Sequence, residues 1–278
     1  MEVILAKTYG FCMGAKRAIE IAKRARKEND GSVNVLKEIV HNPYVVSSLK
    51  KMGIGSVHSL QKVKNGVIIF SAHGVAPDVV EETKNKGLKI VDATCPLVTH
   101  IHRLVKGLAK KGYTIILIGD RQHDEIIGIS GESPKNIKII SKKEEIYNLT
   151  VDSSKVAVIT QTTLSVDDSI EIISILKKKF PDIEVYNTIC NATQSRQKAV
   201  KDLSEKVDLI IVIGSQKSAN SKRLAQIARC CSKPSYLIND GKEISKKWFT
   251  NVKRVGITAG ASTPDEIVEK VIKRVSLL

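Results

Sequence analysis

The sequence predicts an α/β protein made of three similar small units, each with a mainly parallel sheet. Two observations lead to this fold class. Short apolar runs alternate with amphipathic helical segments along the chain, which is the pattern of parallel strands connected by helices. In addition, Cys12, Cys95 and Cys190 recur at intervals of 83 and 95 residues. A regular interval of this kind indicates an internal repeat.

An amphipathic helix is predicted directly after each of these three cysteines. Apolar residues there fall on one helical face, at the i, i+3, i+4 and i+7 spacing. They are Ala15, Ala18, Ile19 and Ala22 in the first segment, Leu97, Ile101, Leu104, Val105 and Leu108 in the second, and Ala199, Val200, Leu203 and Val207 in the third. The repeat therefore assigns the three units to residues 1–95, 96–189 and 190–278.

Each predicted unit also contains two apolar strands that end in polar turns. The first strands end at His41-Asn42-Pro43, at 119–125 and at 214–220, and the second strands with their turns cover 67–74, 156–163 and 255–262. An acidic helix start follows each second strand, at Pro77-Asp78, Asp167-Asp168 and Pro264-Asp265. Ligands of parallel sheets bind at the carboxyl ends of strands. We therefore expect the units to pack around a pseudo-threefold axis, with these turns converging on a central cavity.

Convergence of the turns would bring Cys12, Cys95 and Cys190 together as a metal site. Thiolate sulfur selects zinc or an iron–sulfur cluster. Cysteines usually hold all four irons of a 4Fe-4S cluster, so three of them would leave one iron open as a Lewis acid. Zinc on three cysteines with an open fourth position is the alternative. The adjacent Cys230 and Cys231 are expected to be packing residues.

The remaining polar residues at the strand ends indicate that the ligand is an anion. Imidazole groups are hydrogen-bond donors that suit phosphate oxygens, and three of the six histidines stand at these ends, His41, His73 and His123. The third unit offers neutral donors, namely Ser218, Asn220 and Ser262. The predicted cavity is therefore cationic, rich in donors and matched to a diphosphate-sized anion.

One acidic residue, Glu125, lies two residues beyond His123 and would face the same cavity. A carboxyl group beside an open iron could act as a general acid, or Glu125 could instead serve a helix N-cap. Thr162 and Thr163 carry hydroxyl groups that could bridge this acid and the substrate. Each of the two could equally be a simple helix cap.

Composition excludes several classes of protein. The net charge is +16, but aromatic residues make up only 4% and the basic residues are spread over the chain. Nucleic-acid binding is therefore not expected, and an anionic substrate or an acidic protein partner is favoured over a non-enzymatic nucleic-acid or phospholigand binder. No apolar run approaches the ~20 residues of a membrane span. The odd number of cysteines argues against a disulfide framework, and the N-terminal sequence does not resemble a signal peptide. A cytoplasmic location is therefore expected.

Seven short motifs also carry a family resemblance. They are Gly10–Gly14, Ile39–Asn42, Ser71–Gly74, Asp92–Pro96, Thr160–Ser165, Asn220–Leu224 and Thr258–Ser262. With these motifs in this order, the chain resembles the LytB family, the hydroxymethylbutenyl diphosphate reductases of the non-mevalonate isoprenoid pathway. The resemblance runs nearly end to end.

The resemblance implies three α/β units around a central cavity and one 4Fe-4S cluster, held by Cys12, Cys95 and Cys190 with the fourth iron open to substrate. It implies a two-electron, two-proton reduction of 4-hydroxy-3-methylbut-2-enyl diphosphate to isopentenyl and dimethylallyl diphosphate. Glu125 would supply protons, helped by Thr162. The implied diphosphate ligands are His41, His123, Ser218, Asn220 and Ser262, with His73 nearby.

Two positions depart from the family pattern. Ala219 stands where the family usually has serine, which removes one possible phosphate contact. Asp124 stands where many relatives have proline, and we expect it to loosen the turn that carries Glu125. No nucleotide-binding motif such as G-x-G-x-x-G is apparent. The electrons are therefore expected from a small acidic ferredoxin or flavodoxin, which the basic chain would attract.

Overall fold

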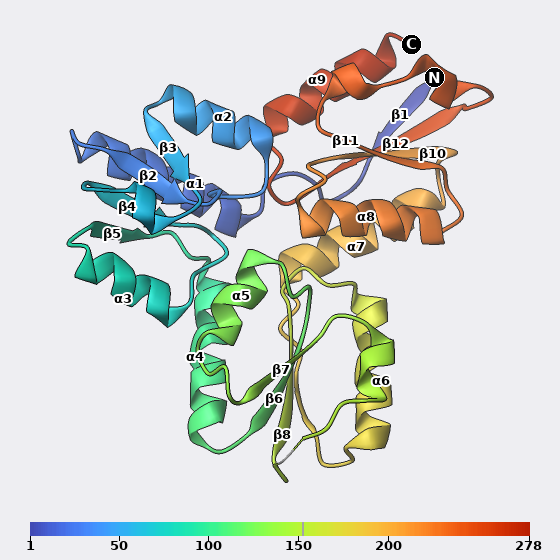
Figure 1. Cartoon of the computed structure of the whole chain (residues 1–278). Coiled ribbons are helices and arrows are strands. Elements are labelled where there is room, and N and C mark those ends of the chain that lie inside the picture. The colour runs from blue at the N-terminus through green and yellow to red at the C-terminus, as the bar shows by residue number, and fades with distance from the viewer. Residues whose placement is uncertain (152) are drawn as a thin grey trace. The chain divides into compact units, whose positions relative to one another are not determined.

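The computed structural model describes residues 1–151 and 153–278, and its strands form three four-stranded sheets (Figure 1). Every strand pairing in the described residues is parallel. This arrangement confirms the predicted fold class. The chain divides into two compact units. The first comprises Met1–Lys16, Val40–Ser48 and Asn191–Leu278, and the second comprises Arg17–Ile39 and Leu49–Cys190.

The first unit contains one sheet in the order β1-β12-β10-β11. Its strands are β1 (Glu2–Leu5), β10 (Leu209–Ile213), β11 (Ser235–Ile238) and β12 (Arg254–Ala259). Its helices are α7 (Asn191–Ser204), α8 (Ala219–Cys230) and α9 (Asp265–Ser276), with the 3-10 turns η3 (Gly241–Glu243) and η4 (Lys246–Phe249). Ile210 and Val212 pack on α7 and α8, whereas Ile211 and Ile213 pack on α9. Both faces of β10 are thus buried, which explains its unbroken apolar sequence.

The second unit contains two sheets, in the orders β3-β2-β4-β5 and β7-β6-β8-β9. The strands are β2 (Val33–Leu36), β3 (Ile54–Val57), β4 (Val67–Phe70), β5 (Lys89–Asp92), β6 (Thr114–Ile118), β7 (Ile137–Ile140), β8 (Val156–Thr160) and β9 (Glu184–Tyr186). The helical segments are α3 (Pro77–Asn85), α4 (Pro96–Lys110), α5 (Asp124–Ser130), α6 (Val166–Lys179), η1 (Leu60–Lys62) and η2 (Lys143–Ile146). Helices α1 (Met13–Lys27) and α2 (Pro43–Lys51) each begin in the first unit and end in the second.

The helices predicted after the three cysteines are confirmed. Helices α1, α4 and α7 each begin one residue after Cys12, Cys95 and Cys190. Most residues of their predicted apolar faces are buried. The exceptions are in α4, where Leu97 is 50% exposed, Val98 fills the first turn of the buried face and Leu104 is only partly buried. Val207 is buried but lies beyond the end of α7. No helix of the described residues is both long and apolar enough to cross a bilayer.

Five of the six predicted strand ends lie where the sequence places them. Strands β4, β6, β8, β10 and β12 each stop directly before their polar turns. The prediction for the first strand is wrong, because β2 ends at Leu36, five residues before His41. Lys37 has φ = 65°, and a left-handed residue breaks the extended backbone there.

The N-terminal strand joins a sheet that the contiguous repeat does not anticipate. Residues Glu2–Leu5 pair with Arg254–Ile257 of β12, so β1 lies in the sheet of the last third of the chain although its residues fall in the predicted unit 1–95. The other two sheets are formed by β2–β5 and by β6–β9. The division of the chain at residues 95 and 190 stays a prediction.

The start of α8 lies against the end of β10, and this close approach requires glycine at residue 214. A Cβ atom added at Gly214 would lie 2.2 Å from Oγ and 2.7 Å from Cβ of Ser221. Gly107, inside α4, has no atom within 4 Å of an added Cβ. The two glycines therefore form a matched pair for substitution.

We expect Gly214→Ala to lower the free energy of unfolding by about 1–3 kcal/mol, because overpacking displaces the helix. The control Gly107→Ala should raise it by roughly 1 kcal/mol, since alanine has the higher helix propensity. Urea denaturation of both variants measures this. Equal effects of the two substitutions would contradict the close approach of α8.

Candidate active site

The best-defined polar contact of the second unit joins Glu125 to Thr162. Glu125 is the second residue of α5 and only 2% exposed. The backbone N–H of Thr162 donates to Oε1 of Glu125, and the Thr162 hydroxyl donates to Oε2, both at 2.7 Å. Strands β6 and β8 are neighbours in the sheet, so the turns that follow them meet at one edge. The fold thus brings together the predicted acid and its predicted helper.

Burial raises the pKa of the Glu125 carboxyl group, and the two hydrogen bonds from Thr162 oppose this rise. The carboxyl group therefore keeps its proton to a higher pH than an exposed glutamate does. When Glu125 is protonated, its O–H can donate to Oγ1 of Thr162, and the hydroxyl proton of Thr162 becomes available to a third group. This pair can hold a proton and pass it on.

Each predicted metal-binding cysteine is held by the same backbone hydrogen bond. The N–H of Cys95 donates to the Ala72 carbonyl at 3.0 Å, that of Cys190 to the Thr162 carbonyl at 3.1 Å, and that of Cys12 to the Ala261 carbonyl at 2.9 Å. Each acceptor stands two residues after the end of a strand, namely β4, β8 or β12. The three cysteines therefore occupy equivalent positions at the carboxyl ends of three sheets.

The surroundings of the cysteines suit thiolates. All three are half-buried, and a helix begins one residue after each. The N–H of Ala15 in α1 donates to Sγ of Cys12 at 3.3 Å. Donors and the positive end of a helix stabilise a thiolate. Three thiolates in such positions fit an iron–sulfur cluster, and they also fit zinc.

Two of the predicted anion-binding histidines lie together in the second unit. The rings of His73 and His123 are 5.4 Å apart and perpendicular. His123 caps α5, and its Nδ1 accepts the N–H of Glu125 at 3.2 Å, so the neutral ring carries its proton on Nε2. The Ser71 hydroxyl accepts the N–H of His73 and lies 3.3 Å from His73 Nδ1. Both rings can therefore offer an Nε2–H donor.

The other predicted anion ligands lie in the first unit. Oγ of Ser262 donates to the His41 carbonyl at 3.4 Å, and Ser218 caps α8 by accepting the N–H of Ser221. Asn220 is 4% exposed, and neither its Oδ1 nor its Nδ2 has a hydrogen-bond partner within the described part of the chain. A buried amide without partners is costly. Asn220 is therefore the clearest sign of a polar ligand in this unit.

Three expectations about individual residues change. Asp124 does not leave its turn loose, because its carboxylate pairs with Lys37 Nζ at 2.5 Å. The hydroxyl of Thr163 already accepts Nε2–H of Gln161 at 3.2 Å. The packing prediction is wrong for Cys230, which ends α8 and is exposed, and it holds for Cys231, which is partly buried against the α7–α8 core. Adjacent helical residues point in different directions, so only one of the two can face the core.

Sequence reasoning missed two buried supporting residues. The guanidinium group of Arg196 donates to the carbonyls of Gly10 and Ala192, and it ties the loop before Cys12 to the first turn of α7. Oε1 of Gln161 accepts the N–H of Asp120 at 3.0 Å and supports the turn before α5. Gln161 lies inside a motif of the resemblance, but the sequence carries no sign that either side chain is buried.

Comparisons with known proteins show which family the chain resembles over nearly its whole length. A family model described as LytB protein matches residues 3–276. The 4-hydroxy-3-methylbut-2-enyl diphosphate reductases of Wolbachia pipientis wMel and Burkholderia pseudomallei (strain 1026b) are 43% and 46% identical to this chain, over 98% of it and 90% and 88% of their own lengths. The structure of the E-1-hydroxy-2-methyl-but-2-enyl-4-diphosphate reductase from Plasmodium falciparum matches with a TM-score of 0.95 and 37% identity, covering 100% of this chain and 87% of that one.

The raised pKa of Glu125 predicts a pH-dependent effect on stability. The folded protein keeps the proton that the unfolded chain loses near pH 4.3, so wild-type stability should fall as the pH rises from about 4.3 through the folded pKa. Glutamine does not ionise. The melting temperature of Glu125→Gln relative to wild type should therefore increase with pH across this window.

Thermal unfolding of wild type and variant at a series of pH values checks this prediction. Glu81→Gln, on the exposed part of α3, is the control for a general change of charge. A difference between Glu125→Gln and wild type that does not vary with pH would contradict the raised pKa.

Proposed function

This chain belongs to the LytB family, and from this membership we propose that it reduces 4-hydroxy-3-methylbut-2-enyl diphosphate at the end of the non-mevalonate isoprenoid pathway. The reaction consumes two electrons and two protons. The bond between carbon and the 4-hydroxyl oxygen breaks, water leaves, and isopentenyl or dimethylallyl diphosphate forms. The observation that carries the proposal is the double contact of Thr162, which holds the Glu125 carboxyl group and accepts the N–H of Cys190.

The cofactor is an iron–sulfur centre, as LytB membership implies. We propose that it is one 4Fe-4S cluster held by Cys12, Cys95 and Cys190, with the fourth iron open. When bound, such a cluster supplies electrons and a Lewis acid for the substrate hydroxyl. The relatives bear the names of reductases, which favours this interpretation over a zinc hydrolase.

The substrate diphosphate would be held by hydrogen-bond donors that lie near the carboxyl ends of strands. The proposed ligands are His41, His73, His123, Ser218, Asn220 and Ser262. Asn220 would gain the partners that its buried amide lacks among the described residues. His123 and His73 would each donate through Nε2–H, because their Nδ1 atoms face Glu125 N–H and the Ser71 hydroxyl. Most of these donors are neutral, so they bind the anion at little cost in desolvated charge.

Glu125 would supply protons through Thr162. Its burial raises the pKa of the carboxyl group and so favours the protonated form, and transfer along the 2.7 Å contact lets Thr162 donate from its own hydroxyl. The Thr163 hydroxyl accepts the Gln161 amide N–H and keeps its own proton, which it would donate to the substrate. A short contact between two fixed side chains gives a defined direction to proton delivery.

The electrons would come from a separate acidic carrier, a ferredoxin or a flavodoxin. Two facts support an external donor. The chain carries +16 net charge, and complementary charge speeds the encounter of two proteins. The sequence also lacks an apparent nucleotide-binding fingerprint of its own. Neither nucleic acid nor a membrane is proposed as a partner, and the cytoplasmic location stays a prediction.

The first test concerns the ligands. Cys12→Ser, Cys95→Ser and Cys190→Ser should each lose iron, sulfide and activity, because serine oxygen is a poor ligand for a soft metal centre. Anaerobic iron and sulfide analysis with Mössbauer spectroscopy measures this. Cys230→Ser and Cys231→Ser are matched controls and should retain both cluster and activity. A brown and fully active Cys95→Ser protein would end the three-thiolate model.

The second test concerns the proton donor. Glu125→Gln keeps the size of the side chain but has no acidic proton, so turnover should fall by about 10²–10⁴-fold. Iron content should stay normal, since no proposed ligand changes. His123→Ala should instead mainly raise KM, because it removes binding rather than proton delivery. Turnover of Glu125→Gln within a few-fold of wild type would assign the proton to another group.

A further inference from the structure

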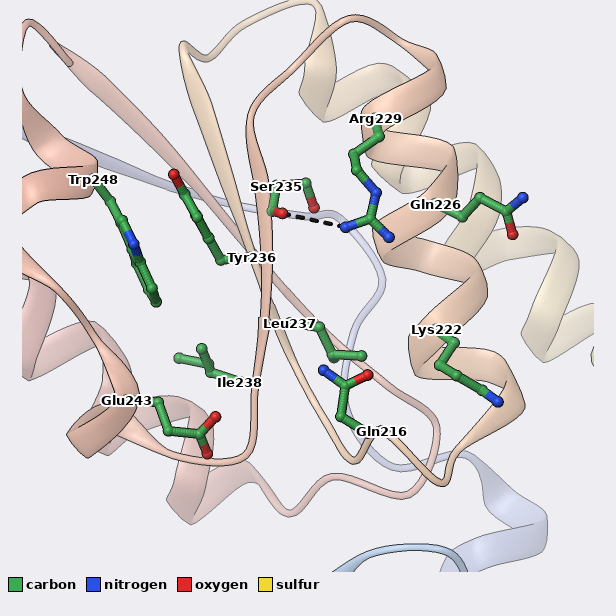
Figure 2. A pocket seen from close by; sticks show the side chains of 10 residues that line it. All are labelled: Gln216, Lys222, Gln226, Arg229, Ser235, Tyr236, Leu237, Ile238, Glu243 and Trp248. Carbon is green, nitrogen blue, oxygen red and sulfur yellow. Dashed lines mark hydrogen bonds between the residues drawn. The ribbon is translucent and has the colours of Figure 1, made fainter.

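Strand β11 presents an open edge on the first unit (Figure 2). Within the described residues it pairs only with β10. The carbonyl of Pro234 accepts the N–H of Ile210 in β10 at 2.9 Å, and that of Ile238 accepts the N–H of Gly214 directly after β10 at 2.8 Å. On the outer side of the strand, the Ser235 carbonyl accepts the Arg229 guanidinium group at 3.4 Å. Because backbone groups alternate along a strand, the N–H and C=O groups of Ser235 and Leu237 face away from the sheet. Natural edges of this kind are sites of pairing with other chains.

A groove of about 710 Å³ follows this edge. Lys222, Gln226 and Arg229 of α8 line one side of the strand (Figure 2). The rings of Tyr236 and Trp248 line the other side, stacked 3.9 Å apart and nearly parallel, with an angle of 6°. A partner along β11 would therefore meet cationic side chains on one face and an aromatic platform on the other.

The chain segment that supplies the groove is rich in positive charge, and Lys222 and Arg229 line the groove itself. Residues 215–254 contain ten Lys and Arg against two Asp and Glu, a net charge of +8. Half of the net charge of +16 thus lies in 40 of 278 residues, because acidic residues are few there, although 35 of the 45 basic residues lie elsewhere in the chain. One of the two acids, Glu243, lines the groove and accepts the N–H of Asn239. A surface with this charge density attracts acidic partners over a long range.

The strand register connects the groove to the cysteine loop of the same unit. Ala259 of β12 lies beside Ile213 of β10, which lies beside Ile238 of β11. Two strand spacings separate Ala259 from Ile238, about 10 Å. The Ala259 carbonyl accepts the N–H of Gly10, two residues before Cys12, and Ile238 lines the groove. One end of the groove is therefore close to a proposed cluster ligand.

We propose that the groove along the outer edge of β11 is the docking site of the acidic electron carrier. This inference rests on the proposed function and adds the location of the partner. Carboxylates of the carrier would meet Lys222 and Arg229 on α8, and also Lys246 and Lys247, which precede Trp248. Two reduced carriers, each oxidised by one electron, would dock in turn for every hydroxyl group removed. A second copy of this chain is disfavoured as the occupant, since both copies would carry the same positive charge.

The test reverses charge at the groove of the reconstituted holoenzyme. The double variant Arg229→Glu/Lys246→Glu is the groove pair. It leaves Lys222 unchanged, because Lys222 is two residues from the proposed ligand Asn220. Lys177→Glu/Lys178→Glu, on the exposed end of α6, changes the net charge equally and is the matched control. An acidic 2Fe-2S ferredoxin is one reductant, and dithionite with methyl viologen is the other.

At low salt, the groove pair should lower kcat/KM for ferredoxin at least about tenfold, and the control pair should lower it less than about threefold. Activity with dithionite should be unchanged in both. Equal loss in the two pairs, or no loss in either, would overturn the docking site. Absence of wild-type activity with both reductants would instead refute the proposed function.

A binding measurement keeps the docking site testable without turnover. Hydrogen exchange of the Ser235 and Leu237 amides, which face away from the sheet, should slow when oxidised ferredoxin is added to wild type but not to the groove pair. Unchanged exchange in wild type at saturating ferredoxin would overturn the proposal. So would a dimer in sedimentation that the groove substitutions dissociate, because the groove would then be occupied by a second copy.

Discussion

A single backbone hydrogen bond, repeated three times, organises the functional end of this protein. In each case a cysteine N–H donates to a carbonyl two residues past the end of a parallel strand, and the acceptors are Ala72, Thr162 and Ala261. The bond fixes the start of the following helix, and at Cys12 the N–H of Ala15 in that first turn donates to the thiol sulfur. It also connects the most distant parts of the chain, because Cys12 depends on a turn that forms 249 residues later. The pairing of β1 with β12 joins the same two distant segments of the chain.

The three turns share this backbone geometry but carry side chains of different chemistry. At the first, the residue after the acceptor is His73, whose ring meets that of His123. At the second, the acceptor itself is Thr162, which donates two hydrogen bonds to the buried carboxyl group of Glu125. At the third, Ser262 follows the acceptor and contacts the His41 carbonyl. A repeated scaffold with unequal side chains thus provides the separate positions that we propose for anion binding and for proton delivery.

Packing and charge are divided between the two ends of α8. Its first turn is pressed against the sheet, where Gly214 leaves room for Ser221 and where Asn220 keeps a buried amide ready for a ligand. Its last turn carries Arg229 beside the open edge of β11. With the proposed substrate ligands at one end and the proposed partner surface at the other, α8 would place the two processes close together without shared residues.

Much of the fold follows from the sequence alone. Continuous apolar runs such as Leu209–Ile213 determine buried parallel strands, and the spacing of Ala15, Ala18 and Ala22 determines a helix face, because burial of apolar area dominates local choices. The three equivalent cysteines and the anion-binding residues were also predicted from their places after strands and from the family motifs. Their roles in cluster and substrate binding are proposals.

The tertiary structure decided several features that the local sequence pattern does not encode. The left-handed backbone at Lys37 ended β2 early, and the ion pair of Asp124 with Lys37 secured a turn that the sequence suggested was loose. The burial of Glu125, which raises its pKa, depends on contacts between residues 37 positions apart. The position of β11 at the edge of its sheet, beside Arg229 of α8, emerges only from the strand order. Periodicity is a local property, whereas desolvation, register and edge position arise from segments that meet only in the folded chain.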